Sequence, residues 1–477
     1  MLKVLHHHVR EGLFEGIKRA NADEQVRAIV IIGEGKTFPC GADIREFHTH
    51  ASVKEPVLTA VGHTIENSGK PVISAIHGTA LGGGLEIALC CHYRIASENA
   101  RIGFPEVLIG LLPGAEGTVR LPRLSGLAFA MDMIAFGKQV NAKDAFRHGI
   151  LDKLCNGNIL EEAKQFATKV IGQPLDSRRL SRLDVKDAAN VDLLFEVALA
   201  QVKRKSRGQI APIYCLKSVR NSVRMSFDKA VEEEQRLIME LMTGYQSTAL
   251  QYSFFADRSA PKWRLPCGAS VHNTKPSRIE TAGVIGAGTM GSGIAVCLIR
   301  AGVPVILVEK NKKMLEKAMK TISGILDGSV KLNRMTSEQK EQCLAILKGT
   351  STLDKLSNVD MVIEAVYENL ELKREIFAQL DKVCKPSTLL CSNTSTLDID
   401  KIASATNRPD KVAGTHFFAP AFIMKLMENV YGTKTSPATV ATVMEFGRRL
   451  GKELEATKEE IKNIRLHLTV TFCTIDL

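Results

Sequence analysis

A glycine-rich turn between an apolar strand and a helix constrains the fold of this chain most. Residues Gly283–Ile294 read G-V-I-G-A-G-T-M-G-S-G-I, in which Gly286, Gly288 and Gly291 have the spacing G-x-G-x-x-G. In a strand–turn–helix unit, the first glycine permits a tight turn and the second lets a pyrophosphate approach the backbone. The third lets the helix pack closely on the strand. The sequence therefore predicts a dinucleotide-binding unit at this turn.

A carboxylate follows the next predicted strand. The apolar run Val303–Val308 ends at Glu309, which lies 23 residues after Gly286. A carboxylate at this place suits the ribose 2′-hydroxyl of NAD and would repel the 2′-phosphate of NADP. We therefore expect NAD as the cofactor. The alternative is a glycine-rich strand-to-helix turn that binds no ligand.

Composition narrows the class of protein. A length of 477 residues predicts about two to four domains. Eleven cysteines without a C-x-x-C pair indicate a reducing compartment, and we expect neither disulfides nor a metal site. No apolar run is long enough to span a bilayer. The net charge of +11 comes without a basic face interleaved with aromatic residues, so an anionic coenzyme explains it at least as well as nucleic acid does.

Three motifs occur in order in the first half of the chain. They are G-A-D-I at Gly41–Ile44, G-G-G-L-E at Gly82–Glu86 and F-P-E-V-L-I-G-L-L-P-G at Phe104–Gly114. Taken singly, Glu86 and Glu106 are acidic residues that complement the dipole at a helix start. Taken together and in this order, the motifs resemble the crotonase superfamily of enoyl-CoA hydratases and isomerases.

The resemblance implies roles for four residues of the first half. The N–H groups of Ala42 and Gly83 match the pair that holds the thioester oxygen as it becomes an enolate, and such donors act where charge develops. Glu86 and Glu106 match the two glutamates that hold the attacking water. Glu106 matches the principal proton donor to the substrate.

The second half carries polar residues after predicted strands, where an open parallel sheet binds its ligands. The order of a crotonase domain, a helical connector and a Rossmann unit resembles the peroxisomal hydratase/3-hydroxyacyl-CoA dehydrogenase family of β-oxidation. His416 matches the family's catalytic base, with Glu428 as its partner and Ser395 as the serine that contacts the substrate oxygen. Glu368 and Lys373 match residues that line the NAD site. The alternative for His416 is a hydrogen-bonded core histidine.

The predicted fold class is α/β, with a crotonase-like domain, a helical connector and a Rossmann-type NAD-binding domain. We place the crotonase-like domain at residues 1–180 and the helical connector and linker at 181–275. The NAD-binding domain follows at 276–450, and an atypical tail at 451–477. Within the NAD-binding domain, Lys312–Leu347 is predicted as one long helical stretch.

The chain departs from the family pattern at both ends. It begins at the first helix of the family, without the preceding strands. After about Leu450 it lacks the family's final strand and the helical domain that closes the dehydrogenase site, so we expect a weakened second activity. Its last residues, Ile475–Leu477, are not the S-K-L type of peroxisomal signal. Family resemblance nevertheless implies the peroxisome.

The resulting hypothesis is a β-oxidation enzyme acting on acyl-CoA thioesters. It would hydrate trans-2-enoyl-CoA, with Δ3–Δ2 isomerisation as a related reaction, and oxidise the 3-hydroxyacyl-CoA product with NAD. The alternative is a non-catalytic protein that binds acyl-CoA and NAD. The sequence leaves the oligomeric state open, a monomer included, and predicts no nucleic-acid partner and no membrane span.

Overall fold

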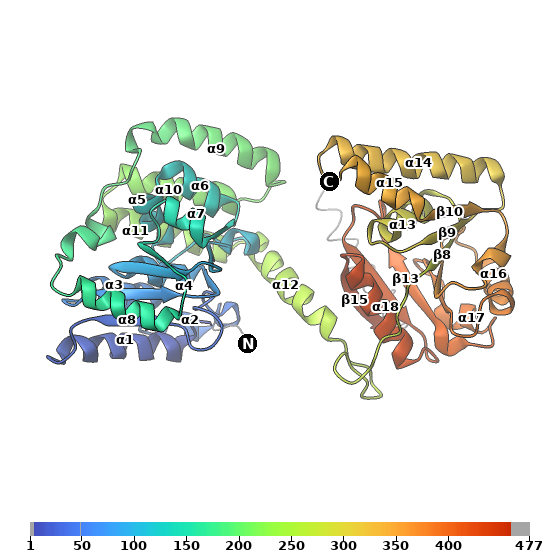
Figure 1. The fold of residues 1–477 in the computed structure, drawn as a ribbon, viewed down its shortest axis with the longest axis horizontal. Coiled ribbons are helices and arrows are strands. Elements are labelled where there is room, and N and C mark those ends of the chain that lie inside the picture. Colours follow the sequence, from blue (N-terminus) through green and yellow to red (C-terminus); the bar gives the residue numbers. More distant parts are fainter. Residues whose placement is uncertain (1–3, 48, 459–477) are drawn as a thin grey trace. The chain divides into compact units, whose positions relative to one another are not determined.

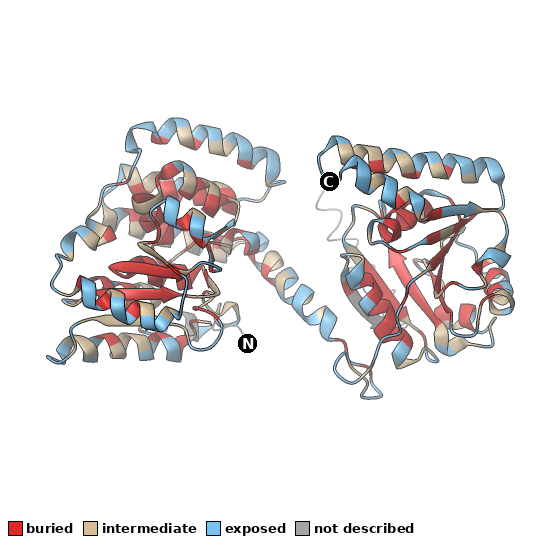
Figure 2. Cartoon of the chain, viewed as in Figure 1, coloured by how far each residue is buried: buried red, intermediate tan, exposed pale blue. Residues whose placement is uncertain are grey.

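The computed structural model describes residues 4–47 and 49–458 and divides into two compact units (Figure 1). The first unit comprises Met1–Phe254 and the second Phe255–Leu477, so the boundary lies within helix α12 (Tyr245–Ser259). In each unit the strands are mostly buried, whereas the outer faces of the helices are exposed (Figure 2). Each unit thus has a hydrophobic core of its own.

A four-stranded parallel sheet forms one layer of the first unit. Its strands follow the order β1 (Ile29–Ile32), β2 (Val72–Ile76), β4 (Tyr93–Ser97) and β7 (Lys153–Cys155). Successive side chains of a strand point to opposite faces. On one face of β2, Val72 therefore packs with helices α1 and α3, whereas Ile73 and Ala75 on the other face pack with α8. These helices span His7–Ala22, Leu58–Glu66 and Ile159–Val170.

A second, smaller sheet positions the two glutamates of the first unit. It consists of β3 (Thr79–Leu81), β5 (Arg101–Gly103) and β6 (Gln139–Asn141). Helix α4 (Gly83–Cys90) begins just after β3, and the 3-10 helix η2 (Glu106–Ile109) begins just after β5. Because β3 and β5 pair in parallel, both helices start at the same edge of this sheet.

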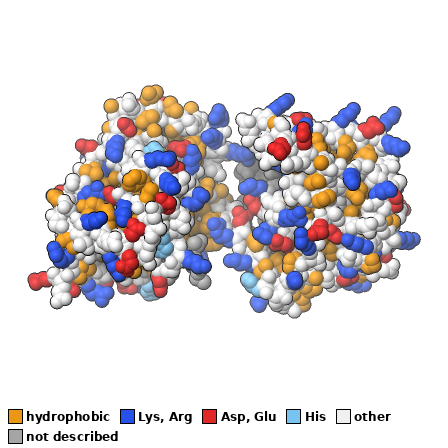
Figure 3. All heavy atoms as spheres, viewed as in Figure 1, with side chains coloured by type: hydrophobic (Ala, Val, Ile, Leu, Met, Phe, Trp, Pro, Cys, Tyr) orange, Lys and Arg blue, Asp and Glu red, His pale blue; other side chains and the backbone are white. Residues whose placement is uncertain are grey.

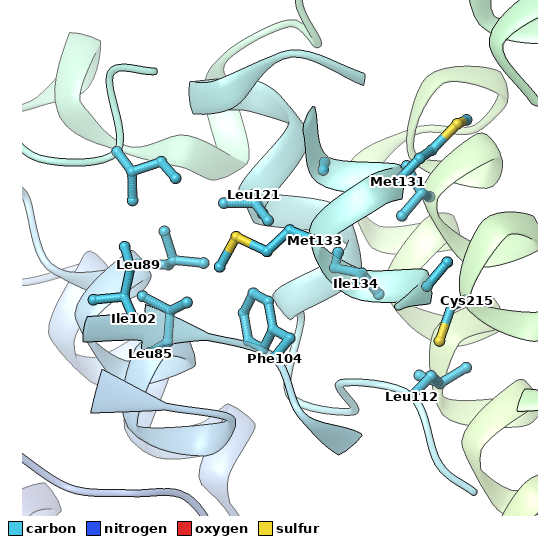
Figure 4. Close-up of a cluster of buried hydrophobic side chains, with 14 of the residues drawn as sticks. Leu85, Leu89, Ile102, Phe104, Leu112, Leu121, Met131, Met133, Ile134 and Cys215 are labelled. Atoms are coloured by element: carbon cyan, nitrogen blue, oxygen red, sulfur yellow. The ribbon is translucent and has the colours of Figure 1, made fainter. Parts of the chain in front are cut away.

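The helices predicted as part of a separate connector at 181–275 pack instead into the core of the first unit. Cys215, Leu216 and Val219 are fully buried, and Figure 4 shows Cys215 near Leu112. An amphipathic pattern predicts a helix with a buried face but does not say which domain covers that face. These helices are α9 (Val191–Lys205), α10 (Ala211–Arg224) and α11 (Phe227–Met242), and they pack in the same core as the earlier helices α5 (Gly117–Ser125), α6 (Leu127–Ala135) and α7 (Ala142–Arg147).

An eight-stranded sheet organises the second unit. The strand order is β10-β9-β8-β11-β12-β13-β14-β15, and all neighbours are parallel except β13 and β14. The chain order reverses direction at β8, so a switch point lies between β8 and β11, where open α/β sheets bind ligands. The strands are β8 (Ala282–Ile285), β9 (Val305–Val308), β10 (Leu347–Thr350), β11 (Met361–Glu364), β12 (Leu389–Ser392), β13 (Val412–Phe417), β14 (Leu426–Tyr431) and β15 (Glu453–Lys458).

Two details of the second unit differ from the sequence prediction. The stretch Lys312–Leu347 is two helices, because Asn333 adopts a left-handed φ of 52° and Thr336 begins a new helix with a capping box. Strand β15 lies in the segment predicted as an atypical tail, where it extends the sheet by pairing in parallel with β14. The α/β unit therefore continues past Leu450, and residues 459–477 lie outside the described part of the chain.

Helices cover the sheet of the second unit. Helix α13 follows β8 directly and packs on β8 and β9. Among the described residues, no helix combines the length and apolar character that a membrane span requires. The helices of this unit are α13 (Thr289–Arg300), α14 (Lys312–Lys331), α15 (Ser337–Ala345), α16 (Leu370–Val383), α17 (Ile399–Ala403) and α18 (Pro437–Arg449), while α2 (His50–Val53) belongs to the first unit.

Candidate active sites

Two backbone segments meet at the start of helix α4. A Cβ added at Gly83 would lie 3.4 Å from the amide nitrogen of Ala42, so these two N–H groups are close together. No described residue accepts a hydrogen bond from either of them. Gly41 and Gly82 have φ values of 107° and 51°, which favour glycine. The two sequence-predicted N–H donors are therefore neighbours and uncommitted.

Glu86 lies one turn into α4 and is buried. Its Oε1 accepts hydrogen bonds from the N–H groups of Ala115, at 2.7 Å, and Gly117, at 2.9 Å. Burial raises the pKa of Glu86 to about 7, although these two N–H groups oppose the rise. Near neutral pH this carboxyl group is therefore balanced between its acid and its base form.

Glu106 is the first residue of η2 and approaches the same place from β5. A Cβ added at Gly82 would collide with Oε1 of Glu106, so a glycine there lets this carboxyl group keep its position. Oε2 is buried and has no hydrogen-bond partner among the described residues. Burial, and after it the charge of Glu86, raises the pKa of Glu106 well above its usual range. The pair thus offers a protonated and an ionisable carboxyl group side by side.

Sequence reasoning missed a set of charged residues behind Glu86. Glu116 has a left-handed φ of 77° and is buried, and its carboxylate pairs with Arg120 and with Nε2 of His63, at 2.6 Å. Arg120 also pairs with Glu66 at 2.6 Å. Glu234, from α11, accepts a hydrogen bond from the N–H of Glu116 at 2.6 Å. The acidic cluster around Glu234 is visible in the sequence, but its contacts are more than a hundred residues away.

The glycine-rich turn after β8 fits a dinucleotide. Gly286 has a φ of 96°, and a Cβ there would lie 2.7 Å from the carbonyl oxygen of Ala365. A Cβ at Gly291 would collide with the carbonyl oxygen of Gly286, whereas open space surrounds Gly288. Helix α13 begins here without a side-chain cap. Its first N–H groups and its dipole therefore face a place that a phosphate can approach.

Glu309 lies beside this turn, at the end of β9. Its Oε2 accepts a hydrogen bond from the N–H of Ala287 at 3.1 Å, and its Oε1 from the N–H of Asn311 at 3.0 Å. Ala287 is the residue between the first two glycines of the motif. The structure thus places the carboxylate predicted for the ribose directly against the glycine-rich turn.

Two carboxylates organise the carboxyl ends of β11 and β12. Glu364 is fully buried and accepts from Nζ of Lys373 and from Oγ of Ser392, each at 2.7 Å. Glu368 accepts from the N–H of Ser395 at 2.9 Å and from its Oγ at 3.3 Å, and lies 3.3 Å from Nζ of Lys373. Burial by itself raises the pKa of Glu368, but the Thr394 hydroxyl and the Lys373 ammonium bring it below its usual range. Glu364 is a residue that the sequence analysis did not single out.

His416 and Glu428 face each other across the antiparallel pair β13 and β14. Nδ1 of His416 lies 2.8 Å from Oε2 of Glu428, and both residues are buried. No described residue hydrogen-bonds Nε2, which leaves that nitrogen available to a substrate. The side chain of Asn393 accepts a hydrogen bond from the N–H of Phe417 at 2.8 Å, which ties the loop that carries Ser395 to the His416 strand.

The described residues provide no other obvious cofactor site. Among them, no group of three His, Cys, Asp or Glu side chains is arranged to hold a metal ion. On the faces drawn in Figure 3, Lys and Arg side chains alternate with Asp and Glu and do not gather into one stripe.

Comparison with known proteins finds a different family in each of the two units. Residues 3–207 match the enoyl-CoA hydratase/isomerase family, and residues 281–459 match the NAD-binding domain of 3-hydroxyacyl-CoA dehydrogenase. The peroxisomal bifunctional enzyme of Danio rerio is 46% identical over 444 residues, which are 93% of this chain and 61% of that protein. The human enzyme of the same name is 43% identical over 441 residues, covering 92% of this chain and 60% of that protein. A peroxisomal fatty acid β-oxidation multifunctional protein of Arabidopsis thaliana is 35% identical, covering 92% and 62%. The chain thus spans about three fifths of the length of these relatives.

Proposed function

We propose that this chain, in which an enoyl-CoA hydratase/isomerase domain precedes the NAD-binding domain of a 3-hydroxyacyl-CoA dehydrogenase, hydrates trans-2-enoyl-CoA thioesters and oxidises the product with NAD. The two reactions are consecutive, because the first yields a 3-hydroxyacyl-CoA and the second converts it to a 3-ketoacyl-CoA. Relatives that align over most of this chain are named a peroxisomal bifunctional enzyme and a peroxisomal fatty acid β-oxidation multifunctional protein. We place this chain in the same compartment.

Hydration requires an enolate to be stabilised and a water molecule to be activated. The adjacent N–H groups of Ala42 and Gly83 donate to the thioester oxygen as negative charge develops on it. The carboxyl groups of Glu86 and Glu106 hold the water over the double bond. The unpartnered Oε2 of Glu106 is the observation that carries this assignment, because a buried acceptor without a protein donor calls for a bound partner.

The proton transfers follow from the pKa values of the two glutamates. Glu86 in its ionised form takes a proton from the water, whose oxygen bonds to the β carbon of the enoyl thioester. Glu106 is protonated near neutral pH and delivers its proton to the α carbon. The product carries both elements of water, and one proton passes back from Glu86 to Glu106 before the next turnover. Movement of a proton between carbons by Glu106 would serve isomerisation in the same site.

The second unit supplies a base for oxidation of the hydroxyl group. Nε2 of His416 accepts the hydroxyl proton, and Glu428 orients the ring through Nδ1 and stabilises the imidazolium. The hydroxyl of Ser395 turns from Glu368, to which it donates at 3.3 Å, and donates to the substrate oxygen, while Glu368 keeps its hydrogen bond from the N–H of Ser395. NAD held at the glycine-rich turn would supply the acceptor for the hydride from the carbon that bears this hydroxyl group.

The residues that would hold NAD are those of the glycine-rich turn. Gly286, Gly288 and Gly291 admit the pyrophosphate at the start of α13, and Glu309 accepts from the ribose hydroxyls. Lys373 and Glu368 border the site at the ends of β11 and β12. The side chains present therefore suit NAD better than NADP.

Turnover of crotonyl-CoA tests both activities in one cuvette. Loss of the enoyl absorbance in the absence of NAD would show hydration, and NADH formed after NAD is added would show oxidation. Glu309→Ala should weaken NADH binding in a fluorescence titration and leave hydration unchanged, because it lies in the other unit. Folded protein that retains acyl-CoA but gives neither signal would establish the non-catalytic alternative instead.

A further inference from the structure

Four successive N–H groups behind the first site are shared between two carboxylates. Those of Ala115 and Gly117 donate to Glu86, at 2.7 and 2.9 Å. Those of Glu116 and Thr118 donate to Glu234, at 2.6 and 3.1 Å. Successive N–H groups of this segment therefore donate in turn to Glu86 on one side and to Glu234 on the other.

Glu234 has no other evident role in the unit. It is fully buried in α11, and its three partners all belong to this segment, since the hydroxyl of Thr118 also donates to it. The same hydroxyl lies 2.6 Å from Oγ of Ser218 in α10. A buried carboxylate is costly unless its partners are fixed. Its position behind the segment therefore calls for an explanation beyond packing.

We propose that Glu234 is a positioning residue for the hydratase reaction, which holds Ala115–Thr118 so that two of its N–H groups point at Glu86. This inference rests on the proposed hydratase function. It adds Glu234 to the four residues that the family resemblance assigned to the first site. Glu116 adopts a left-handed φ of 77°, a conformation that a non-glycine residue keeps only when its surroundings impose it. The hydrogen bond from its N–H to Glu234 supplies that constraint on one side, and the pairs of its side chain with Arg120 and His63 on the other.

The consequence concerns the proton affinity of Glu86. The N–H groups of Ala115 and Gly117 stabilise its ionised form and so lower a pKa that burial raises. If the segment turns away, Glu86 loses this stabilisation and binds its proton more tightly. Burial, and after it the charge of Glu86, raises the pKa of Glu234 itself well above its usual range, so a glutamine at this position replaces a neutral acid with a neutral amide. Glu106, whose pKa is raised in the same way, and the ion pair of Glu116 with Arg120 remain in place.

The test replaces Glu234 with glutamine in the full chain. The glutamine amide has one acceptor oxygen in place of two. Its NH₂ group therefore meets the N–H of either Glu116 or Thr118, and that N–H loses its acceptor. We expect kcat for crotonyl-CoA hydration to fall by roughly tenfold to a hundredfold, the effect of leaving a buried N–H donor without its acceptor, with a smaller change in KM. The lower pKa in the pH profile of kcat/KM should rise.

Two controls separate positioning from general stability. Glu233 is the adjacent residue and is partly exposed, and its carboxylate pairs with Arg236 on the helix surface. Glu233→Gln should keep the wild-type kcat and pH profile. Thr118→Val, which removes the hydroxyl, should reproduce part of the Glu234→Gln effect. Thr118→Ser, which keeps the hydroxyl, should have the wild-type kcat and pH profile. This second pair decides the matter if Glu234→Gln does not fold.

The outcomes for this residue and for the proposed function are distinct. A folded Glu234→Gln variant with the kcat and pH profile of the wild type, or a loss matched by Glu233→Gln, overturns the positioning role. Absence of hydration by the wild type refutes the proposed function instead. In that case carbon-13 NMR of glutamate-labelled protein, with Glu86→Gln to assign the signal, still measures the Glu86 titration. An unchanged pKa in Glu234→Gln then overturns the inference.

Discussion

Replacing Glu106 with glutamine isolates the proton that we assign to this residue. Its carboxyl group is held in the acid form by burial and by the charge of Glu86, which together raise its pKa. Glutamine has the same shape, so it fits against Gly82, where no side chain has room. It carries no proton that the α carbon of the substrate can take. The substitution therefore removes general acid catalysis and little else.

The size of the effect follows from this loss. A positioned general acid contributes about 10²–10⁴ in rate, so kcat should fall by that factor, which is about 3–5 kcal/mol in the barrier. Stability should change by less than about 1 kcal/mol. Oε2 has no hydrogen-bond partner to lose, and a neutral amide replaces a neutral acid.

Hydration of crotonyl-CoA, followed by the loss of enoyl absorbance, measures the change in kcat. Thermal unfolding and acyl-CoA binding should remain at the wild-type values. Glu98→Gln is a matched control, because the side chain of Glu98 makes no polar contact with the described residues beyond an exposed ion pair with Lys143 in the same unit. If Glu106→Gln keeps more than about a tenth of the wild-type kcat, short of the loss expected for a general acid, Glu106 is not the proton donor.

The remaining predictions concern the other groups of the two sites. Gly288→Ala should weaken NADH binding by about 1.4 kcal/mol or more, a tenfold change, without lowering the melting temperature, because open space surrounds it. Gly291→Ala should instead destabilise the second unit by roughly 1–3 kcal/mol, since its methyl group would collide with a backbone carbonyl. Burial raises the pKa of Glu86 from 4.5 to about 7, so the folded chain keeps a proton that the unfolded chain releases. Its unfolding free energy should fall by roughly 3 kcal/mol as the pH rises across that interval, and denaturant titrations of Glu86→Gln should lack this slope. Glu428→Gln should lower NAD-dependent oxidation of 3-hydroxybutyryl-CoA by roughly 10²–10⁴ with unchanged NADH affinity, whereas normal turnover would refute the role of Glu428 as the partner of His416.

Local features of the two sites can be predicted from the sequence, because they depend on residues within a few positions of one another. The turn after β8 needs glycine at Gly286 for a positive φ and at Gly291 for close contact, and both requirements appear as motif spacing. The same holds for Gly82, whose positive φ of 51° favours glycine. Matching of motifs then predicted the domain order that the family comparisons confirm.

Long-range packing is what the sequence alone did not determine. Helices α9, α10 and α11 have clear amphipathic patterns, yet only the folded chain shows that they complete the first core. Strand β15 became recognisable as a strand through its pairing with β14. A periodic pattern defines the face that an element buries, while its partner depends on the whole chain.

The electrostatic state of the first site likewise depends on tertiary structure. Glu234 and the N–H of Glu116 are 118 residues apart and form a hydrogen bond of 2.6 Å. No local sequence pattern predicts this contact. The sequence determined that Glu86 and Glu106 are carboxylic acids placed at two helix starts. Only the fold decided how completely each is buried and how near the two carboxyl groups lie to one another. Burial and neighbouring charge set a pKa. Which of these two residues acts as the base and which as the acid therefore depends on the folded chain.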